Sequence, residues 1–329
     1  MAAAYENIIE RTEWFHQKKW GVFLHLLYGT TNNPEHAMNM GVGKTDWTEC
    51  VNAFDVDLFA KQLADTNAGY LMLTLTQGTQ YFIAPNETFE RIAGYKQGET
   101  CSKIDFVLKM SDALRRYDID LFLYFHGDGP IHDPVALKAF GPPCNDPFVP
   151  MTYEFLEKWA GVIREYSERY GDRIKGWWID GCYEFLGYNN DNLKVLARAA
   201  RAGNPDALVA SNYYGCTDKY SVLLDAVRGG IGDDDYTAGE LVHFNAKPYG
   251  PTVGRTRWHI LSFLGVTPKG EYEYSGWAKP GSKYTPAYMH DYVKDVYERG
   301  GVVTIDICAY RDGHIDPVQA EVLRALKDL

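Results

Sequence analysis

The residues best suited to chemistry lie in the run Gly-Trp-Trp-Ile-Asp-Gly at 176–181, where apolar residues lead directly into a carboxylate. This pattern predicts a buried strand that ends at Asp180, so that the carboxylate projects from the strand tip into a cleft. Gly181 then permits the close approach of a substrate. An aspartate at a strand end also commonly caps a loop, and this second interpretation stays open for the run taken alone.

Polar side chains follow other apolar runs as well. One run ends at His25, a second leads into His126 and Asp128, and a third leads into Tyr213. A single histidine at a strand end is more often structural than functional. Several polar strand ends on one rim nevertheless predict a binding cleft, because such sites combine apolar walls with a few placed polar groups.

Other site chemistries find less support in the sequence. His25, His126, Asp128 and Asp180 are possible metal ligands, but no HxH or HExxH pair is present, so the sequence predicts no metal and no cofactor. A GxSxG nucleophile motif is absent, and the six cysteines are scattered without a metal or disulfide spacing. Paired carboxylates remain, which is the chemistry of glycoside hydrolysis.

The composition excludes several classes of partner. The chain has 329 residues and a net charge of −11, which argues against nucleic acid and against an anionic membrane surface. No apolar stretch is long enough to span a bilayer, and the first residues do not resemble a signal peptide. The chain is therefore either cytoplasmic or exported with its signal removed. Its 24 Tyr and 8 Trp suit a carbohydrate ligand, although they also suit packing.

Short apolar runs alternate with amphipathic segments along the whole chain. Strands are predicted at Trp20–Leu27, Tyr70–Thr76, Ile119–His126, Gly176–Asp180, Ala207–Asn212 and Gly301–Ile307. Helices are predicted at Val56–Thr66, Lys103–Tyr117, Thr152–Tyr170, Asn190–Ala202, Pro286–Arg299 and Pro317–Lys327. Such alternation indicates parallel β/α units, and the less regular stretch 219–285 leaves room for eight strands. We therefore predict a single α/β domain over 1–329, a (β/α)8 TIM-type barrel, with a doubly wound open sheet as the second choice.

Three loops are too long and too rich in Gly, Pro and Asn to be simple connections. They are Tyr28–Cys50, Gly127–Pro150 and Gly229–Arg257. Each lies after an apparent strand, which in a barrel places it at the C-terminal face, where active sites lie. We expect these loops to frame the substrate cleft.

The order of several motifs resembles family 29 of the glycoside hydrolases, the alpha-L-fucosidases. Residues 14–25 resemble the family's WF…KFGIFIHWG opening, and Phe54–Leu73 resembles its second β/α unit. Gly176–Gly181 is similar to the family's WxDG strand, and Gly300–Leu329 resembles its last strand and helix. The resemblance implies a barrel, a retaining mechanism and Asp180 as the nucleophile.

The sequence also departs from the family pattern. Leu26-Leu27 replaces the Trp-Gly that follows the first-strand histidine, and Ile305–Cys308 replaces Asn-Val-Gly-Pro. The histidine pair that binds fucose in the family is replaced within the stretch Thr76–Gln80, so that Gln77 occupies this place. The chain is also expected to lack the C-terminal β-sandwich of many fucosidases. The resemblance therefore implies the scaffold and nucleophile, with an altered set of sugar-recognising residues.

A retaining mechanism needs a second carboxylate about 5–5.5 Å from the nucleophile. Gly232–Glu240 resembles the family's D-[YF]-x-T-P-E stretch, which implies Glu240 as the acid/base. The acidic run 233–235 either raises a neighbouring pKa by repulsion between like charges or is simply solvated. Glu184 and Glu49 are the alternatives for this role.

Together these observations predict a glycosidase with catalytic Asp180 and Glu240 and a carbohydrate substrate. The predicted substrate-binding residues are His25, Trp47, Glu49, Gln77, His126, Asp128, Trp178, Tyr213 and Trp258, with Tyr183 and Trp277 as further aromatic candidates. One alternative is a catalytically degenerate barrel that only binds carbohydrate. Another is a metal-dependent isomerase or epimerase on the same fold.

Overall fold

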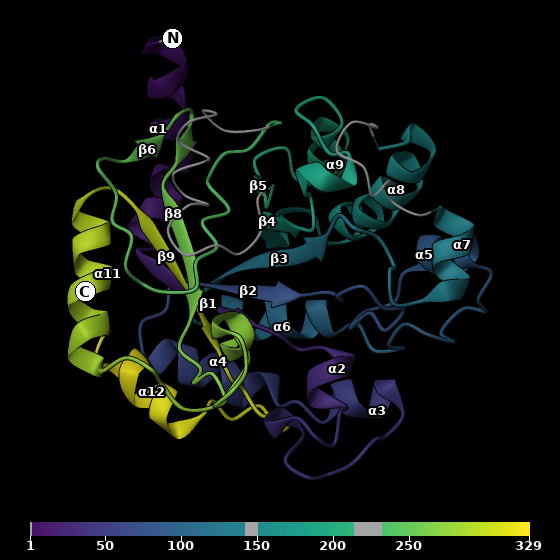
Figure 1. The fold of residues 1–329 in the computed structure, drawn as a ribbon, viewed down its shortest axis with the longest axis horizontal. Helices are drawn as coiled ribbons and strands as arrows, with labels where there is room; N and C mark the ends of the chain where they lie inside the picture. Colours follow the sequence, from purple (N-terminus) through teal and green to yellow (C-terminus); the bar gives the residue numbers. More distant parts are fainter. Residues whose placement is uncertain (1, 142–150, 214–231) are drawn as a thin grey trace.

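The fold is built around one parallel sheet that curls around an interior (Figure 1). The computed structural model describes residues 2–141, 151–213 and 232–329. Seven strands follow the order β5-β4-β3-β2-β1-β9-β8. They are β1 (Trp20–Leu24), β2 (Tyr70–Thr74), β3 (Asp120–His126), β4 (Ile174–Asp180), β5 (Leu208–Ser211), β8 (His259–Phe263) and β9 (Val302–Ile307). A small antiparallel hairpin precedes β8 and consists of β6 (Thr252–Val253) and β7 (Thr256–Arg257).

Helices lie around the outside of the curled sheet (Figure 1). The α-helices are α1 (Ala2–Gln17), α2 (Tyr28–Thr31), α3 (Trp47–Asn52), α4 (Val56–Asp65), α5 (Glu87–Ala93), α6 (Phe106–Arg115), α7 (Pro134–Phe140), α8 (Tyr153–Tyr170), α9 (Leu193–Ala200), α11 (Pro286–Glu298) and α12 (Pro317–Arg324). Short 3₁₀ turns are η1 (Ala37–Asn39), η2 (Gly171–Arg173), η3 (Glu184–Leu186) and η4 (Glu273–Gly276). The six predicted strands and six predicted helices are therefore confirmed, with ends shifted by a few residues.

Local sequence explains where these helices begin. Five of the outer helices, α4, α6, α8, α11 and α12, start after a short side chain whose oxygen accepts hydrogen bonds from the first turn, which satisfies otherwise unpaired N–H groups. These caps are Asp55, Asp105, Thr152, Thr285 and Asp316. The helix α1 and the strand β8 were not predicted from the sequence, and neither were the short helices α2, α3, α5 and α7.

Residues 235–241, hereafter the closing segment, run between the two edges of the sheet. Asp235 N donates to Val209 O of β5 at 2.8 Å. On the other side, Thr237 N donates to Arg257 O at 3.0 Å and Leu241 N donates to Leu261 O of β8 at 2.8 Å. The sheet is thus a parallel, curled array of the kind that a TIM-like barrel contains, with this irregular segment between β5 and β8.

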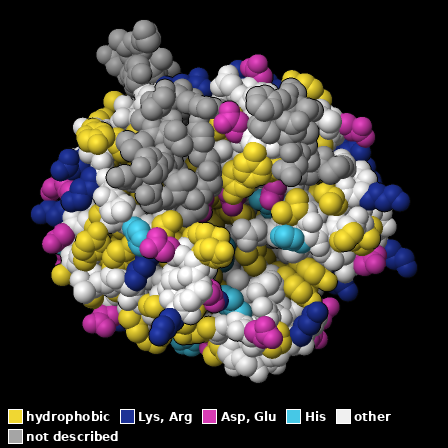
Figure 2. All heavy atoms as spheres, in the orientation of Figure 1, with side chains coloured by type: hydrophobic (Ala, Val, Ile, Leu, Met, Phe, Trp, Pro, Cys, Tyr) yellow, Lys and Arg dark blue, Asp and Glu magenta, His cyan; other side chains and the backbone are white. Residues whose placement is uncertain are grey.

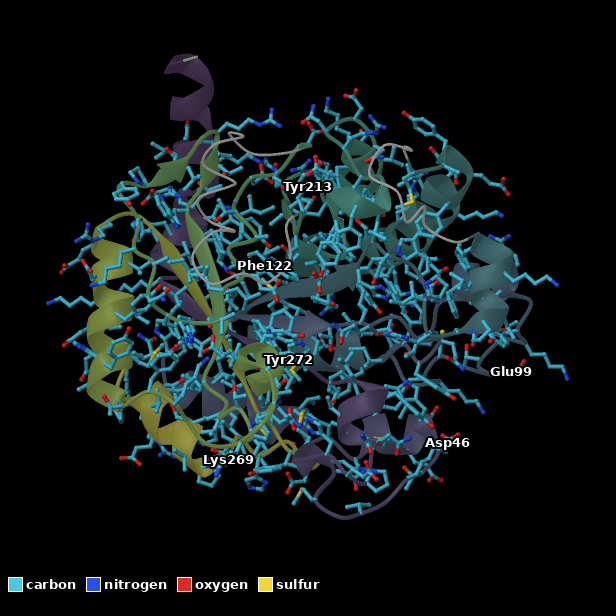
Figure 3. The ribbon with its side chains drawn as sticks, in the orientation of Figure 1. Asp46, Glu99, Phe122, Tyr213, Lys269 and Tyr272 are labelled. Atoms are coloured by element: carbon cyan, nitrogen blue, oxygen red, sulfur yellow. The ribbon has the colours of Figure 1, made fainter. Side chains whose placement is uncertain are left out.

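Alternate residues on each strand separate two apolar layers. Leu121, Leu123 and other residues of this parity pack against the outer helices, whereas Phe122 and Tyr124 face the interior. Phe122 lies near the middle of the molecule in Figure 3, whereas Asp46 and Glu99 lie at its edge. Side chains alternate between the two faces of a strand. A residue at the end of a strand therefore faces the interior when the residue two positions before it does.

The helix α1 closes one end of the interior. Phe15 is fully buried among three interior rings, with ring centroids 5.2 Å from Tyr70, 5.1 Å from Phe122 and 5.2 Å from Tyr236. These contacts lie near the amino-terminal ends of the strands. The carboxyl-terminal ends are therefore the open side of the sheet.

The acidic run before Glu240 is mainly structural. Asp235 accepts from Arg11 Nε and from Arg201 Nη2, each at 2.7 Å, and from Val209 N at 2.9 Å. Asp234 accepts from the backbone and hydroxyl of Ser211. Both carboxylates are largely buried, so the expectation of a solvated run is wrong for these two residues. They attach the start of the closing segment to β5.

None of the described helices combines the length and apolar character that crossing a bilayer requires.

A buried histidine makes the stability of this fold depend on pH. His259 is fully buried, its Nδ1 lies 2.9 Å from Thr237 O, and its Nε2 lies 2.6 Å from Thr304 Oγ1. Burial lowers the pKa of His259 to about 4. Since an unfolded histidine titrates near pH 6.5, the unfolded chain binds more protons between about pH 4 and 6.5. Stability should therefore fall by about 3 kcal/mol as the pH is lowered through this window.

Thermal unfolding of wild-type protein and of His259→Gln between pH 4 and 7 checks this prediction. The variant should lose this part of the pH dependence, even if its stability at pH 7 is lower. His314→Gln is the control, because His314 is exposed on a surface loop. Equal slopes for wild type and His259→Gln would contradict the prediction.

Candidate active site

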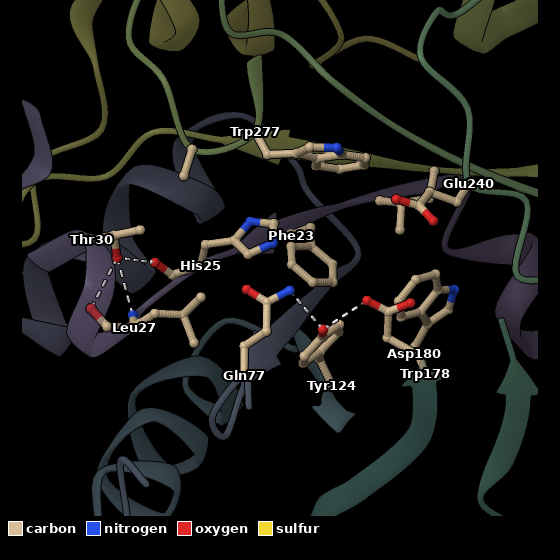
Figure 4. A pocket seen from close by; sticks show the side chains of 12 residues that line it. Phe23, His25, Leu27, Thr30, Gln77, Tyr124, Trp178, Asp180, Glu240 and Trp277 are labelled. Carbon is tan, nitrogen blue, oxygen red and sulfur yellow. Dashed lines mark hydrogen bonds between the residues drawn. The ribbon is translucent and has the colours of Figure 1, made fainter. Parts of the chain in front are cut away.

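A cavity of about 240 Å³ opens at the carboxyl-terminal ends of the strands. Its lining comes from residues far apart in sequence: Phe23, His25, Leu27, Thr30, Gln77, Tyr124, Trp178, Asp180, Glu240, Leu261, Trp277 and Ala278 (Figure 4). On the corresponding face of the molecule, Lys and Arg side chains lie mostly at the edge (Figure 2). Strand ends are the expected place for a site in an α/β fold of this kind.

Asp180 ends β4 and accepts hydrogen bonds from four donors. Its Oδ1 accepts from Gly181 N at 2.8 Å, from Asn212 Nδ2 at 2.9 Å and from Tyr183 Oη at 3.2 Å. Its Oδ2 accepts from Tyr124 Oη at 2.8 Å. These hydrogen bonds hold the carboxylate in one orientation at the cavity wall.

Gly181 has a structural requirement of its own. It has a φ of +63°, and a Cβ at this position would lie 2.9 Å from the carboxylate of Asp128. A side chain is therefore excluded by both conformation and space. The expected close approach exists, but the neighbour is Asp128 of the same chain.

Asn212 joins the two carboxylates that the sequence selected. Its Nδ2 donates to Asp180 Oδ1 at 2.9 Å and to Glu240 Oε2 at 2.6 Å. Because both oxygens lie on one nitrogen, they can be no farther apart than about 5.5 Å, the upper end of the separation in retaining glycosidases. The side chain of Asn212 is itself buried, so this bridge is protected from water.

Glu240 owes its position to the closing segment. It pairs with Leu261 of β8 through a parallel bridge, and Leu261 N donates to Gly239 O at 2.9 Å. Gly239 has a φ of +62°, and a Cβ there would lie 2.0 Å from His259 O. The backbone beside Glu240 is thus packed tightly against β8, and Glu240 is 9% exposed.

Two tyrosines act as hydrogen-bond donors to Asp180. Burial, together with the negative charge of Asp180, raises the pKa of Tyr124 well above its usual range. The negative charge of Asp180, together with burial, raises the pKa of Tyr183. Both phenols are therefore neutral at physiological pH and keep the hydrogen that they donate. Gln77 Nε2 in turn donates to Tyr124 Oη at 3.0 Å.

His25 and Asp306 form a buried pair at the cavity wall. His25 Nδ1 lies 2.6 Å from Asp306 Oδ1, and Ala278 N donates to Asp306 Oδ2 at 2.7 Å. Burial raises the pKa of Asp306, against the opposing effects of these two partners. Ala278 has a φ of +56°, a conformation that costs energy for a residue with a side chain. Asp306 therefore orients both the imidazole and the backbone that follows Trp277.

Aromatic rings form much of the remaining wall. The ring centroid of Phe23 lies 4.5 Å from that of His25, and the ring centroid of Trp277 lies 5.8 Å from that of the same imidazole. Trp178 stacks on Tyr124 at 5.6 Å. The indole N–H of Trp178 donates to Ala238 O at 3.0 Å, which fixes the ring against the closing segment. Such a wall suits a ligand with both apolar and polar faces.

Five of the residues predicted from the sequence line this cavity: His25, Gln77, Trp178, Asp180 and Glu240. Tyr183 touches Asp180, and Trp277, a further aromatic candidate, also lines the cavity.

The structure places the other predicted residues outside the cavity lining. His126 is buried, accepts from Gly78 N at 2.8 Å and is paired with Asp128, so it supports the loop after β2. Trp47 is buried and donates to Phe82 O at 2.7 Å, whereas Glu49 is exposed on α3. Tyr213 donates to Tyr188 O, and Trp258 packs in the outer layer near Tyr249.

Sequence reasoning did not select Tyr124, Asn212 or Asp306. The two-residue period of the strands contains the missing signal. Tyr124 follows Phe122 on the interior face, Asn212 follows Ala210, and Asp306 follows Thr304. A polar residue at the end of a strand points into the interior if the residue two positions before it belongs to the interior core. This rule identifies Tyr124, Asn212 and Asp306.

Among the described residues, no group of three or more His, Cys, Asp or Glu side chains is arranged to hold a metal ion. The four possible ligands weighed from the sequence have other neighbours. His25 pairs with Asp306, His126 pairs with Asp128, and Asp180 is held by Tyr124, Tyr183 and Asn212.

No protein-family model matches this chain, and no curated protein sequence matches it. Solved structures do match. An alpha-L-fucosidase of family 29 from Bacteroides thetaiotaomicron superposes with a TM-score of 0.63 and 15% identity, covering 97% of this chain and 72% of that one. The endo-fucoidan hydrolase MfFcnA4 of family 107 gives a TM-score of 0.65 and 14% identity, with 97% and 53% covered.

A third similar structure is a variant of the alpha-L-fucosidase AlfC in complex with Fuca(1,6)GlcNAc. It gives a TM-score of 0.62 and 15% identity, and 97% of each chain is covered. The structural neighbours are thus fucosidases of family 29 and fucoidan hydrolases of family 107. The resemblance predicted from the sequence is confirmed at the level of the fold.

The pairing of His25 with Asp306 predicts the effect of Asp306→Asn. In wild type, Asp306 can only accept when it is ionised, so His25 carries its hydrogen on Nδ1. In the variant, one arrangement satisfies both neighbours: the amide oxygen accepts from Ala278 N, and the amide NH2 donates to His25 Nδ1. We therefore expect the neutral ring to move its hydrogen to Nε2, which reverses its hydrogen-bonding role.

Nitrogen-15 NMR of labelled histidine at a pH where the ring is neutral distinguishes the two tautomers. Asp316→Asn is a control with the same chemical change at a helix cap. An unchanged His25 tautomer in Asp306→Asn would show that Asp306 does not determine it.

Proposed function

We propose that this chain is a retaining glycoside hydrolase, with Asp180 as nucleophile and Glu240 as acid/base. The observation that carries the proposal is the amide of Asn212, which binds both carboxylates at 2.9 and 2.6 Å. Two carboxylates this close leave no room for a water molecule between nucleophile and sugar, which favours direct attack by the carboxylate. The fold of the similar structures supports the same class of reaction.

The proposed architecture is one domain in which the closing segment serves as the eighth barrel strand. Its hydrogen bonds to Val209 and Leu261 support this assignment. In such a barrel Asp180, Asn212 and Glu240 come from three consecutive positions around the ring: the end of β4, the residue directly after β5, and the closing segment. The side chains at the ends of several strands meet at the C-terminal face of such a barrel, which is where a sugar ring would be held.

In the proposed reaction, Asp180 attacks the anomeric carbon while Glu240 protonates the leaving oxygen. Glu240 then removes a proton from the water that releases the sugar. His25, Gln77, Trp178 and Trp277 are proposed to contact the sugar, because they line the cavity beside both carboxylates. A volume of about 240 Å³ suits one sugar ring, so the rest of a longer substrate would lie outside.

Asp180→Asn should lower turnover roughly 10⁴-fold or more, because the nucleophile is lost. Glu240→Gln should behave differently: it should retain kcat/KM on 2,4-dinitrophenyl glycosides, whose leaving group needs no proton, and lose it on 4-methoxyphenyl glycosides, while its kcat falls because the base of the second step is also lost. Initial rates on paired substrates, with circular dichroism to verify folding, measure both effects. External azide attacks the anomeric carbon without a general base, so it should restore the kcat of Glu240→Gln on the activated substrate.

Wild-type turnover in Asp180→Asn would refute the proposal. Glu49→Gln is a control for Glu240→Gln, since Glu49 is an exposed glutamate on α3. Stabilisation of the wild type by free sugars without hydrolysis of any glycoside would instead identify a carbohydrate-binding protein on a degenerate barrel.

The substrate specificity should differ from that of a simple fucosidase. Gln77 and Gly78 stand where the resembling family has its histidine pair, and a site without a donor for a given hydroxyl no longer selects for it. We expect turnover of 4-nitrophenyl alpha-L-fucoside well below the typical enzyme value of about 10 per second. Another glycoside or a branched substrate should react faster.

A panel of 4-nitrophenyl glycosides measures this preference. Restoring the second histidine by Gly78→His is not a usable test. Gly78 has a φ of +67°, and a Cβ there would lie 2.6 Å from the His132 ring. Efficient cleavage of the simple fucoside by wild type would show that the missing histidines do not determine specificity.

A further inference from the structure

The two oxygens of Asp180 have different surroundings. Oδ1 accepts three hydrogen bonds, from Gly181 N, Asn212 Nδ2 and Tyr183 Oη. Oδ2 accepts one, from Tyr124 Oη at 2.8 Å. A carboxylate offers about two lone-pair positions on each oxygen. Oδ1 is therefore saturated, whereas Oδ2 has one lone pair left.

Tyr124 is suited to hold this second oxygen in place. Its ring is packed between Trp178, stacked at a centroid distance of 5.6 Å, and Phe23, whose ring is perpendicular to it at 5.5 Å. Its hydroxyl accepts from Gln77 Nε2 at 3.0 Å and donates to Asp180 Oδ2. The dashed lines in Figure 4 follow this chain from Gln77 through Tyr124 to Asp180 along the floor of the cavity.

We propose that Oδ2 is the atom of Asp180 that bonds to the sugar, and that Tyr124 is a positioning residue that aims Oδ2 and promotes release of the sugar. This inference rests on the proposed function, whose nucleophile it specifies to a single atom. It also assigns a task to Tyr124, which sequence reasoning did not select.

The reaction balances as follows. In the first step a lone pair of Oδ2 forms a bond to the anomeric carbon, and the bond from that carbon to the leaving oxygen breaks. Its electron pair stays on the leaving oxygen, which takes a proton from Glu240. In the second step water bonds to the anomeric carbon, its proton passes to Glu240, and the bond to Oδ2 breaks with its electron pair returning to Asp180.

The hydrogen bond from Tyr124 changes in strength between these steps. Oδ2 carries negative charge in the free enzyme, but it is a weakly accepting ester oxygen in the covalent intermediate. The donated hydrogen bond is therefore weak in the intermediate and grows stronger as the bond to the sugar breaks. Tyr124 should accelerate the second step without a comparable gain in the first.

Oδ1 behaves differently in this scheme. It becomes the carbonyl oxygen of the ester, which still accepts hydrogen bonds well. Tyr183, which donates to Oδ1, keeps its partner in both steps. Tyr124 and Tyr183 can therefore be compared directly: both donate to Asp180, but Tyr124 donates to Oδ2 and Tyr183 to Oδ1.

The test compares Tyr124→Phe with Tyr183→Phe on the 2,4-dinitrophenyl glycoside that the wild type cleaves fastest among fucose, galactose, rhamnose and arabinose derivatives. With this leaving group the second step limits turnover. Tyr124→Phe should lower kcat by about 10- to 100-fold, the effect of one charge-assisted hydrogen bond. KM should fall in parallel, so that kcat/KM stays nearly constant, and intact-mass spectra at steady state should show more glycosylated enzyme.

Tyr183→Phe should lower kcat less than Tyr124→Phe does, with no fall in KM and no accumulation of adduct, because Oδ1 accepts its hydrogen bond in both steps. A second measurement avoids steady-state assumptions. The enzyme is trapped with the matching 2-deoxy-2-fluoroglycosyl fluoride, freed of excess reagent and allowed to regain activity. Reactivation should be 10- to 100-fold slower in Tyr124→Phe than in wild type, and circular dichroism verifies the fold of both variants.

The possible failures are distinguishable. If wild type forms an adduct on Asp180 but Tyr124→Phe lowers kcat/KM as much as kcat, or reactivates at the wild-type rate, the assignment of Oδ2 and Tyr124 is wrong and the proposed function stands. If wild type neither hydrolyses any of these glycosides nor forms an adduct on Asp180, both proposals fail together.

Discussion

The site depends on one amide group that donates to two carboxylates. Asn212 Nδ2 lies within hydrogen-bonding distance of Asp180 and Glu240, and the amide is buried at the end of β5. Two carboxylates this close repel each other when both are charged, and a shared donor offsets part of that cost. The strand β4 and the closing segment, which lie on either side of β5, must therefore bring their carboxylates to the same amide.

The closing segment meets this requirement although it is the least regular part of the sheet. Asp235 attaches its start to Arg11, Arg201 and Val209, and Gly239 allows its end to pack on His259. Between these two points the chain has little freedom, so Glu240 reaches Asn212 reproducibly. The buried charges far from the cavity thus contribute to its geometry, although none of them contacts it.

Much of the scaffold is visible in the sequence because its signals are local. Apolar runs such as Tyr70–Thr74 and capped helices such as α4 depend on nearby residues, and a strand tip such as Asp180 follows from the run before it. Glu240 came from resemblance to a family motif, since its segment has no strand-like period. Asn212 and Asp306 depend on partners at long range, at Glu240 and at Ala278. His126 was selected as a rim residue, but a neighbouring loop turns its ring toward Gly78 and Asp128 instead.

The buried ring of Phe15 on α1 closes the interior below the cavity and so affects the order in which molecules enter and leave. Phe15 and its neighbours Tyr70, Phe122 and Tyr236 fill the interior below the site, so in the part of the chain that the structure describes the cavity is a blind well with its opening above. Under the proposed function, a longer substrate enters such a well end first, and only its terminal unit reaches the bottom. In the proposed reaction, the water of the second step must then occupy the space that the leaving group vacated after the first step. Because the cavity opens on one side, molecules must enter and leave it one after another. The buried rings around Phe15, which stabilise the fold, therefore also determine this order.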